Sequence, residues 1–188
     1  MNFKFLCLLV LVLFQVNISF GIIAKVDTAV INKWIDESNE VIYVKPEIAS
    51  LYIDSVYSAS SEIGYQFGIY KSHNSRAIVL FMTGQYEKSI EEYLKALPYA
   101  DEELPYQEVR LYSNIAYSLR SLGFQDSAIY YTLKASQFSQ ENGLEEVYQQ
   151  SVLDLAYIYM NKDDFIKAAQ YYNIVSDYIE LSSDKEFL

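Results

Sequence analysis

Few residues of this chain have a type and spacing that could support catalysis or bind a metal. His73 is the only histidine and Cys7 the only cysteine, so neither a histidine-dependent triad nor a cluster of histidine and cysteine metal ligands can form. The acidic residues Asp163 and Asp164, and those from 101 to 103, lack the alternating spacing of a calcium loop. No glycine-rich phosphate-binding pattern occurs. The sequence therefore predicts no enzyme, no cofactor and no metal site.

The acidic balance of the chain argues against one class of partner. Of 188 residues, 14 are Lys or Arg and 25 are Asp or Glu, which gives a formal net charge of -11. Phosphate backbones are bound by clustered Lys and Arg side chains, so we expect no nucleic acid partner. With 52% hydrophobic and 21% charged residues, the chain has the composition of an ordered protein that buries a core.

The first residues have the pattern of a secretory signal peptide. Lys4 precedes an apolar run from Phe5 to Phe14, and the small residues Ser19 and Gly21 follow it. We therefore predict cleavage after Gly21 and an exported protein, periplasmic or extracellular. The alternative is an uncleaved membrane anchor, but the apolar run is shorter than the roughly 20 residues that span a bilayer.

Tyrosine is the residue type whose abundance points to binding, because the chain contains 19 of them. Many fall at apolar positions of amphipathic segments, and we expect most of these to be core residues. Tyr117 and Tyr157 each follow a small residue, Ala116 and Ala156, and should project away from the contact that the alanine makes. Aromatic and Arg side chains are common anchors of protein interfaces, so we predict that the face carrying Tyr117 and Tyr157 is a binding surface.

Helical periodicity and glycine spacing define the elements that must position these side chains. Apolar residues recur at intervals of three and four, and no stretch has the alternation of a strand. Gly64, Gly84, Gly123 and Gly143 mark turns, because glycine accepts the left-handed conformation that ends many helices. The predicted helices cover about residues 27–43, 48–59 with an end near Gly64, 66–82, 86–100, 106–121, 125–141, 145–161 and 164–182.

Paired, these helices resemble the tetratricopeptide repeat. That family places a small residue among large apolar ones in the first helix of each repeat and an alanine in the second. Arg76 replaces an apolar residue of the pattern and is a departure from it. The residues that occupy the places of the pattern are His73, Arg76, Ala77, Leu80, Ser89 and Tyr93 in the first copy, Tyr112, Ile115, Ala116, Leu119, Ala128 and Thr132 in the second, and Val152, Leu155, Ala156, Tyr159, Ala168 and Tyr172 in the third.

The resemblance implies an all-α fold, a right-handed α-solenoid of antiparallel helical hairpins with three clear repeats and one degenerate N-terminal hairpin. The expected organisation is a signal peptide at 1–21, the degenerate hairpin at 22–64, the repeats at 65–182 and a short C-terminal end at 183–188. The period of about 40 residues exceeds the usual length of about 34. It resembles the long-period repeats of exported N-terminal regions in bacterial membrane-bound regulatory and sensor proteins.

In this family the first helices line a concave groove that receives a protein or peptide segment, so the resemblance implies an interaction module without catalysis. We expect the scaffold or sensing part of a larger membrane-associated signalling protein, attached to a membrane only through an uncleaved signal or a span encoded downstream. The alternative is a self-contained receptor for a peptide or small ligand. The residues expected on the groove face are Asn74, Ile78, Arg110, Asn114, Tyr117, Arg120, Asp154, Tyr157 and Asn161.

The last predicted helix carries a second apolar row. Ile166, Ile174, Tyr178 and Leu181 lie to one side of the stripe that can pack inward, and no later helix follows in the sequence to cover them. Because each unit of a repeat protein buries its apolar surface against its neighbours, an uncovered row predicts a further contact. We therefore expect either self-association through this helix or continuation of the chain in a longer protein.

Overall fold

The computed structural model describes residues 27–101 and 103–186, with side chains described as far as residue 180. The predicted signal peptide and its cleavage after Gly21 lie outside the described residues. Within the described part the chain is helical and without strands, which confirms the all-α fold class. The elements are α2 (Thr28–Val41), α3 (Pro46–Ile63), α4 (Gln66–Met82), α5 (Tyr86–Ala96), the short 3-10 helix η1 (Leu97–Tyr99), α6 (Tyr106–Ser121), α7 (Gln125–Glu141), α8 (Glu145–Asn161) and α9 (Phe165–Glu186).

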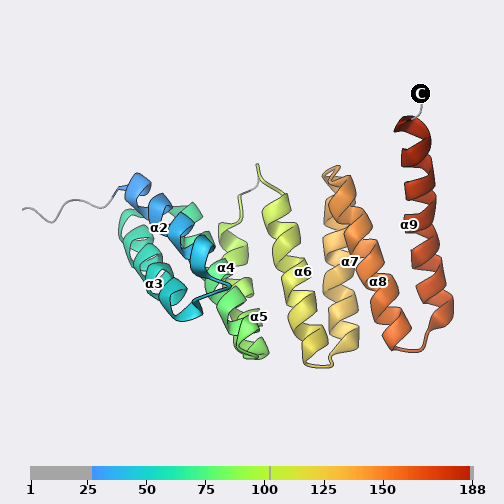
Figure 1. Cartoon of the computed structure of the whole chain (residues 1–188), viewed down its shortest axis with the longest axis horizontal. Coiled ribbons are helices and arrows are strands. Elements are labelled where there is room, and N and C mark those ends of the chain that lie inside the picture. Colours follow the sequence, from blue (N-terminus) through green and yellow to red (C-terminus); the bar gives the residue numbers. More distant parts are fainter. Residues whose placement is uncertain (1–26, 102, 187–188) are drawn as a thin grey trace, which may run out of the picture.

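The helices lie in chain order along one elongated body (Figure 1). Each helix packs mainly against the helix before it and the helix after it, and α2 also contacts α4. The core is divided accordingly. One buried cluster joins Ile31 and Ile35 of α2 to Val56 of α3, and another joins Tyr70 of α4 to Leu111 of α6. These buried clusters therefore lie between helices that are adjacent or one helix apart in the sequence.

The turns between helices confirm the predicted role of glycine. The backbone φ angle is positive at four glycines: 71° at Gly64, 75° at Gly84, 82° at Gly123 and 67° at Gly143. A residue with a Cβ atom adopts this left-handed conformation at a cost, whereas glycine does not. Asp163, between α8 and α9, takes the same place with a φ of 58°. The predicted bounds 66–82, 106–121, 125–141 and 145–161 agree with those of α4, α6, α7 and α8.

The prediction of one helix over residues 86–100 is wrong at its C-terminal end. α5 ends at Ala96, and Leu97–Tyr99 form η1. Pro98 has no backbone N–H and cannot continue the hydrogen-bond ladder of an α-helix, so the chain tightens and leaves the axis of α5. The ring of Tyr99 thereby comes to lie 6.3 Å from the ring of His73, measured between centroids.

The small residues of the predicted repeats lie at helix contacts. Ala77 and Ala156 are fully buried, and Ala116 is 6% exposed. The hydroxyl of Ser89 in α5 donates to the backbone carbonyl of Ala77 in α4, at 2.8 Å, so these two helices approach closely at that point. A larger residue at such a contact would separate the helices.

The apolar row predicted on α9 is partly exposed. Ile166 is 76% exposed, Ile174 is 41% exposed and Tyr178 is half-buried, while the side chain of Leu181 lies outside the described residues.

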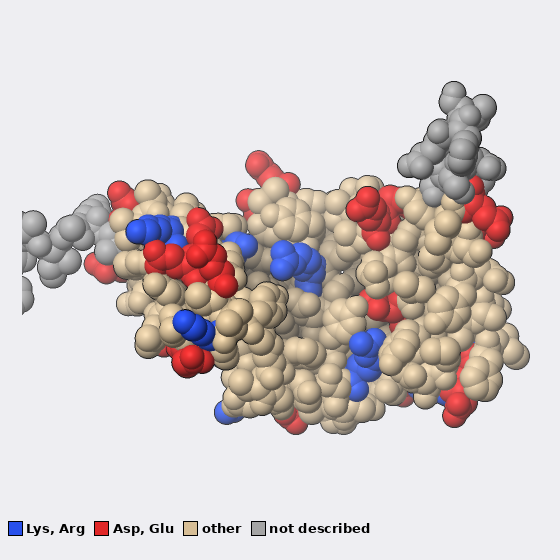
Figure 2. Space-filling view, in the orientation of Figure 1, with Lys and Arg blue, Asp and Glu red and all other residues tan. Residues whose placement is uncertain are grey.

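Among the described helices, none combines the length and the apolar character that crossing a membrane requires. On the face shown in Figure 2, the Lys and Arg side chains are scattered among other residues.

Candidate interaction site

Four of the predicted groove residues meet between α6 and α8. The hydroxyl of Tyr117 in α6 donates to the carboxylate of Asp154 in α8, 2.9 Å from Oδ2 and 3.0 Å from Oδ1. Gln150, one turn before Asp154, donates to the same carboxylate at 3.4 Å. A charge-assisted hydrogen bond of this kind fixes the two helices relative to each other at this point.

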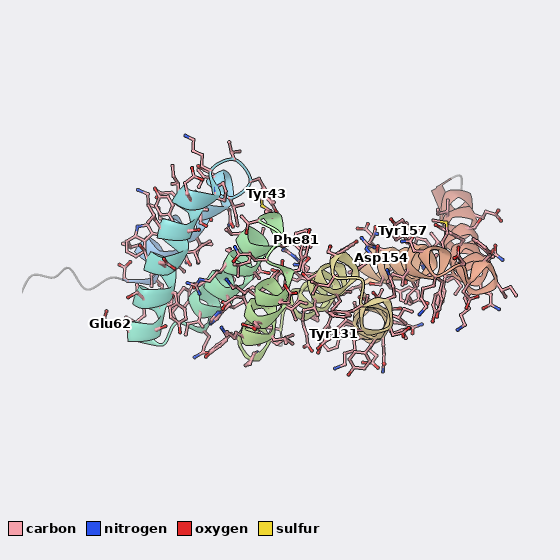
Figure 3. The ribbon with its side chains drawn as sticks, turned by 90° about the horizontal axis from the view of Figure 1, so that it is seen from below. Tyr43, Glu62, Phe81, Tyr131, Asp154 and Tyr157 are labelled. Atoms are coloured by element: carbon pink, nitrogen blue, oxygen red, sulfur yellow. The ribbon has the colours of Figure 1, made fainter. Side chains whose placement is uncertain are left out.

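Arg120 joins the same two helices through aromatic rings. Its guanidinium carbon lies 4.7 Å from the centroid of the Tyr117 ring and 4.8 Å from that of Tyr157 in α8. Both distances fall within the range of cation–π attraction. Asp154 and Tyr157 lie on the same edge of the row of helices, whereas Tyr131 lies on the opposite edge (Figure 3). We call Tyr117, Arg120, Asp154 and Tyr157 the α6–α8 cluster.

Partial burial raises the pKa values of both acidic groups of the α6–α8 cluster, Asp154 and Tyr117. Burial raises the pKa of Asp154 above its ordinary value, although the hydrogen bond from Tyr117 and the charge of Arg120 act in the opposite direction. Burial, together with the nearby Asp154 carboxylate, raises the pKa of Tyr117 to about 12. Tyr117 therefore keeps its proton at neutral pH and remains a donor to Asp154.

The cavity beneath the α6–α8 cluster is too small for an organic ligand. The cavity behind Tyr117 and Asp154 has a volume of about 10 Å³, and Thr132 of α7 and Ile158 of α8 are among its lining residues. This is room for one water molecule, far below the several hundred Å³ of a typical small-molecule site. Recognition here would take place on the surface, where Tyr157 is 43% exposed.

No contact with the α6–α8 cluster is recorded for the other predicted groove residues, and they differ in exposure. Arg110 and Asn161 are exposed, and Asn114 is partly buried. Ile78 is also partly buried and packs against core clusters. Asn74 was expected on the groove face, but it is only 5% exposed and therefore does not lie on the surface. The reason is that α4 contacts α2, α3, α5 and η1, so it is covered on more sides than the sequence pattern of a single helix can indicate.

The structure also forms a cleft that the sequence reasoning missed, which we call the His73 cleft. It has a volume of about 500 Å³ and is lined by Tyr57 of α3, His73 and Arg76 of α4, Glu92 and Lys95 of α5, and Pro98 and Tyr99 at η1. The one signal in the sequence was Arg76, a cation at a position where the repeat pattern has an apolar residue, one turn after the only histidine.

Glu92 is the electrostatic centre of the His73 cleft. Its Oε1 accepts a hydrogen bond from Lys95 at 2.7 Å, and its Oε2 lies 2.7 Å from His73 Nδ1. Burial by itself would raise the pKa of Glu92, but the hydrogen bonds from Lys95 and His73 outweigh it and lower that pKa. Glu92 is therefore ionised at neutral pH.

Comparison with known proteins assigns this chain to no family. No family model matches the chain, and no curated protein matches it. Among the solved structures that resemble it is the crystal structure of BtubC (BKLC) from P. vanneervenii, with 23% sequence identity and a TM-score of 0.49 over 78% of this chain. This chain spans about half of that one, 53% of its length.

Proposed function

We propose that this chain is an exported helical-repeat interaction module of the tetratricopeptide type, built as a right-handed solenoid of helical hairpins. In this proposal it is the scaffold or sensing part of a larger membrane-associated signalling protein, and the α6–α8 cluster binds a segment of a protein partner. Buried alanines at the repeat positions and packing between consecutive helices support the architecture. Export rests on the sequence pattern of residues 1–21.

The observation that carries the proposal is the way Arg120 lies against two tyrosine rings from different helices. Side chains already held in place lose little conformational freedom when a partner binds, which favours affinity. Tyr and Arg are the residue types most often found to dominate the binding energy of protein interfaces. At this site Arg120 lies against the rings of both tyrosines, and Tyr157 still presents 43% of its surface to a partner.

The chemistry of the α6–α8 cluster fits a peptide segment better than a highly charged ligand. Its one cation, Arg120, faces one carboxylate, Asp154, so the local charge is balanced and gives no strong attraction for either sign. The exposed surface of Tyr157 offers an apolar contact beside hydrogen-bonding groups. A partner segment would place an apolar or aromatic side chain on this ring.

Selection of peptides from a random displayed library against the immobilised chain tests this function. Peptides that bind should lose about tenfold or more in affinity with Tyr157→Ala, because removal of an anchor residue typically costs more than about 1.4 kcal/mol. The matched control is Tyr130→Ala, since Tyr130 lies on α7 and is 54% exposed. Fluorescence polarisation with the selected peptides gives the affinities.

Two results would contradict the proposal. The first is a set of bound peptides whose affinity is unchanged by Tyr157→Ala. The second is a set that depends on Tyr130 instead, which would move the binding surface to α7. Circular dichroism of both variants should match that of the unmodified chain, because both side chains are exposed.

A further inference from the structure

Three aromatic rings form one wall of the His73 cleft. The rings of Tyr57 and His73 meet edge to face, with 5.2 Å between centroids and 69° between planes. The ring of Tyr99 is closer to parallel with that of His73, with 6.3 Å between centroids and 22° between planes. Tyr57 is 39% exposed, so part of this wall is open to a ligand. Flat aromatic surfaces of this kind bind the faces or edges of a ligand ring.

The charged groups of the His73 cleft exclude a cationic ligand. Both oxygens of Glu92 are already in contact with donors: Oε1 with Lys95, and Oε2 with His73 and, at 3.5 Å, with Arg76. The Glu92 side chain is only 12% exposed. A ligand cation would therefore have to displace a bound donor to reach this carboxylate, which is the only one among the lining residues.

The same geometry leaves positive charge available to an anion. Lys95 has three N–H donors and is 55% exposed, and one of its donors binds Glu92. Arg76 has five donors, of which it directs one toward Glu92 and one toward Asp54, at 2.9 Å. Asp54 is 70% exposed and stands outside the lining of the cleft. Among the lining residues, two cations therefore face one carboxylate, in a chain whose net charge is -11.

We propose that the His73 cleft binds a small aromatic carboxylate, with the ligand ring against Tyr57 and Tyr99 and its carboxylate on Lys95 and Arg76. A volume of about 500 Å³ is suited to a small organic molecule. The cleft is built from α3, α4, α5 and η1, whereas the α6–α8 cluster uses none of these elements. The two sites can therefore be tested separately.

The single histidine of the chain provides a direct probe. Because His73 is the only histidine, the ring carbon-bound protons of a tag-free protein give one set of imidazole signals in a proton–carbon NMR spectrum. We would titrate the full chain at fixed pH and ionic strength with sodium benzoate, then with sodium acetate, which lacks the ring, and with benzyl alcohol, which lacks the charge. Each ligand would also be titrated into two variants, Lys95→Ala and Lys134→Ala.

Lys134 is a matched control because its ammonium group also lies beside tyrosine rings, 5.3 Å from Tyr112 and 5.1 Å from Tyr130, but outside the cleft. We expect saturable shifts of the His73 signals with benzoate, and binding about tenfold weaker with acetate or benzyl alcohol. Lys95→Ala should weaken benzoate binding about tenfold, through loss of a charge-assisted hydrogen bond, and Lys134→Ala should leave it unchanged.

Three outcomes would overturn the proposal. They are the absence of saturable shifts with benzoate, equal affinity for acetate and benzoate, and equal benzoate affinity in the Lys95→Ala and unmodified chains. The Tyr157→Ala variant should bind benzoate normally, so loss of peptide binding at the α6–α8 cluster and loss of benzoate binding at the His73 cleft are distinguishable results.

Discussion

Tyr117 and Asp154 depend on each other because each is partly buried. The single hydroxyl of Tyr117 donates one shared hydrogen bond to the two carboxylate oxygens of Asp154, at 2.9 and 3.0 Å. A second donor, the side-chain amide of Gln150, lies farther away, at 3.4 Å. A buried carboxylate without a donor carries an unfavourable desolvation energy. The hydroxyl of Tyr117 therefore contributes to stability as well as to the shape of the proposed binding surface.

At the residue scale, we predict that Tyr117→Phe lowers the free energy of unfolding by about 1–3 kcal/mol at pH 7, since it leaves the Asp154 carboxylate without its main donor. Tyr157→Phe is the control and should change little. The pKa of Asp154 is already raised by burial, and removal of Tyr117 would raise it further. A raised folded-state pKa favours folding below the unfolded value and loses that effect as pH rises, so the deficit of Tyr117→Phe should shrink in acid.

Urea denaturation of both variants at pH 7 and at acidic pH measures these differences. If Tyr117→Phe and Tyr157→Phe had the same midpoint at pH 7, the hydrogen bond across α6 and α8 would have no energetic role.

At the contact between α3 and α4, Gly68 is the residue that allows close approach. A Cβ atom at this position would overlap the hydroxyl of Ser60 and lie 2.9 Å from its Cβ atom. Glycine inside a helix is less favourable than alanine by up to about 1 kcal/mol, so its presence here is explained by packing and not by helix propensity. Ser60 is fully buried, and its hydroxyl has no hydrogen-bond partner among the described residues.

At the element scale, we predict that Gly68→Ala lowers the free energy of unfolding by about 1–3 kcal/mol through overpacking, against the gain expected from helix propensity. The double variant Ser60→Gly with Gly68→Ala exchanges the small residue across the contact and should recover much of the loss. Urea midpoints of the single and double variants measure the coupling. A Gly68→Ala protein more stable than the unmodified chain would mean that α3 and α4 do not pack closely here.

Tyrosines buried along the row make the whole molecule sensitive to alkaline pH. Tyr70 is 2% exposed and Tyr93 is 3% exposed, both in the cluster that joins α4, α5 and α6. Burial raises the pKa of Tyr70 to about 12, although the nearby Arg110 lowers it in part, and burial also raises that of Tyr93. In an unfolded chain a tyrosine ionises near pH 10. Between these values the unfolded chain releases protons that the folded chain keeps.

At the scale of the whole molecule, we therefore predict that ionisation of these tyrosines leaves the free energy of unfolding unchanged below about pH 10. It should lower that free energy as the pH rises from there toward the folded-state pKa values. Tyr70→Phe should decline less steeply than the unmodified chain, because one ionisable group is removed from the core. Urea denaturation from pH 9 upward, with tyrosinate absorbance recorded in parallel, measures both effects. An unchanged midpoint as the pH rises past 11 would contradict the burial of these rings.

The sequence alone determined the helices and part of the candidate site. Bounds such as 66–82 and 145–161 follow from local periodicity and from glycines whose backbone conformation depends on their own covalent structure. Tyr117 and Asp154 could be assigned to one face because the direction of a side chain around its own helix is fixed by the helical repeat. Asn74 was assigned by the same rule, which cannot foresee that neighbouring helices cover that face.

Only the tertiary structure decided which groups from different helices meet. Asp154 lies 37 residues from Tyr117, and Glu92 lies 19 residues from His73. Each contact depends on how far one helix is rotated about its axis and shifted against the next, and this is set by core packing over the whole interface. The 3-10 turn at Pro98, which brings Tyr99 to His73, completes the His73 cleft in the same way. Sequence periodicity gives the direction of each side chain from its own helix, and packing determines what it contacts.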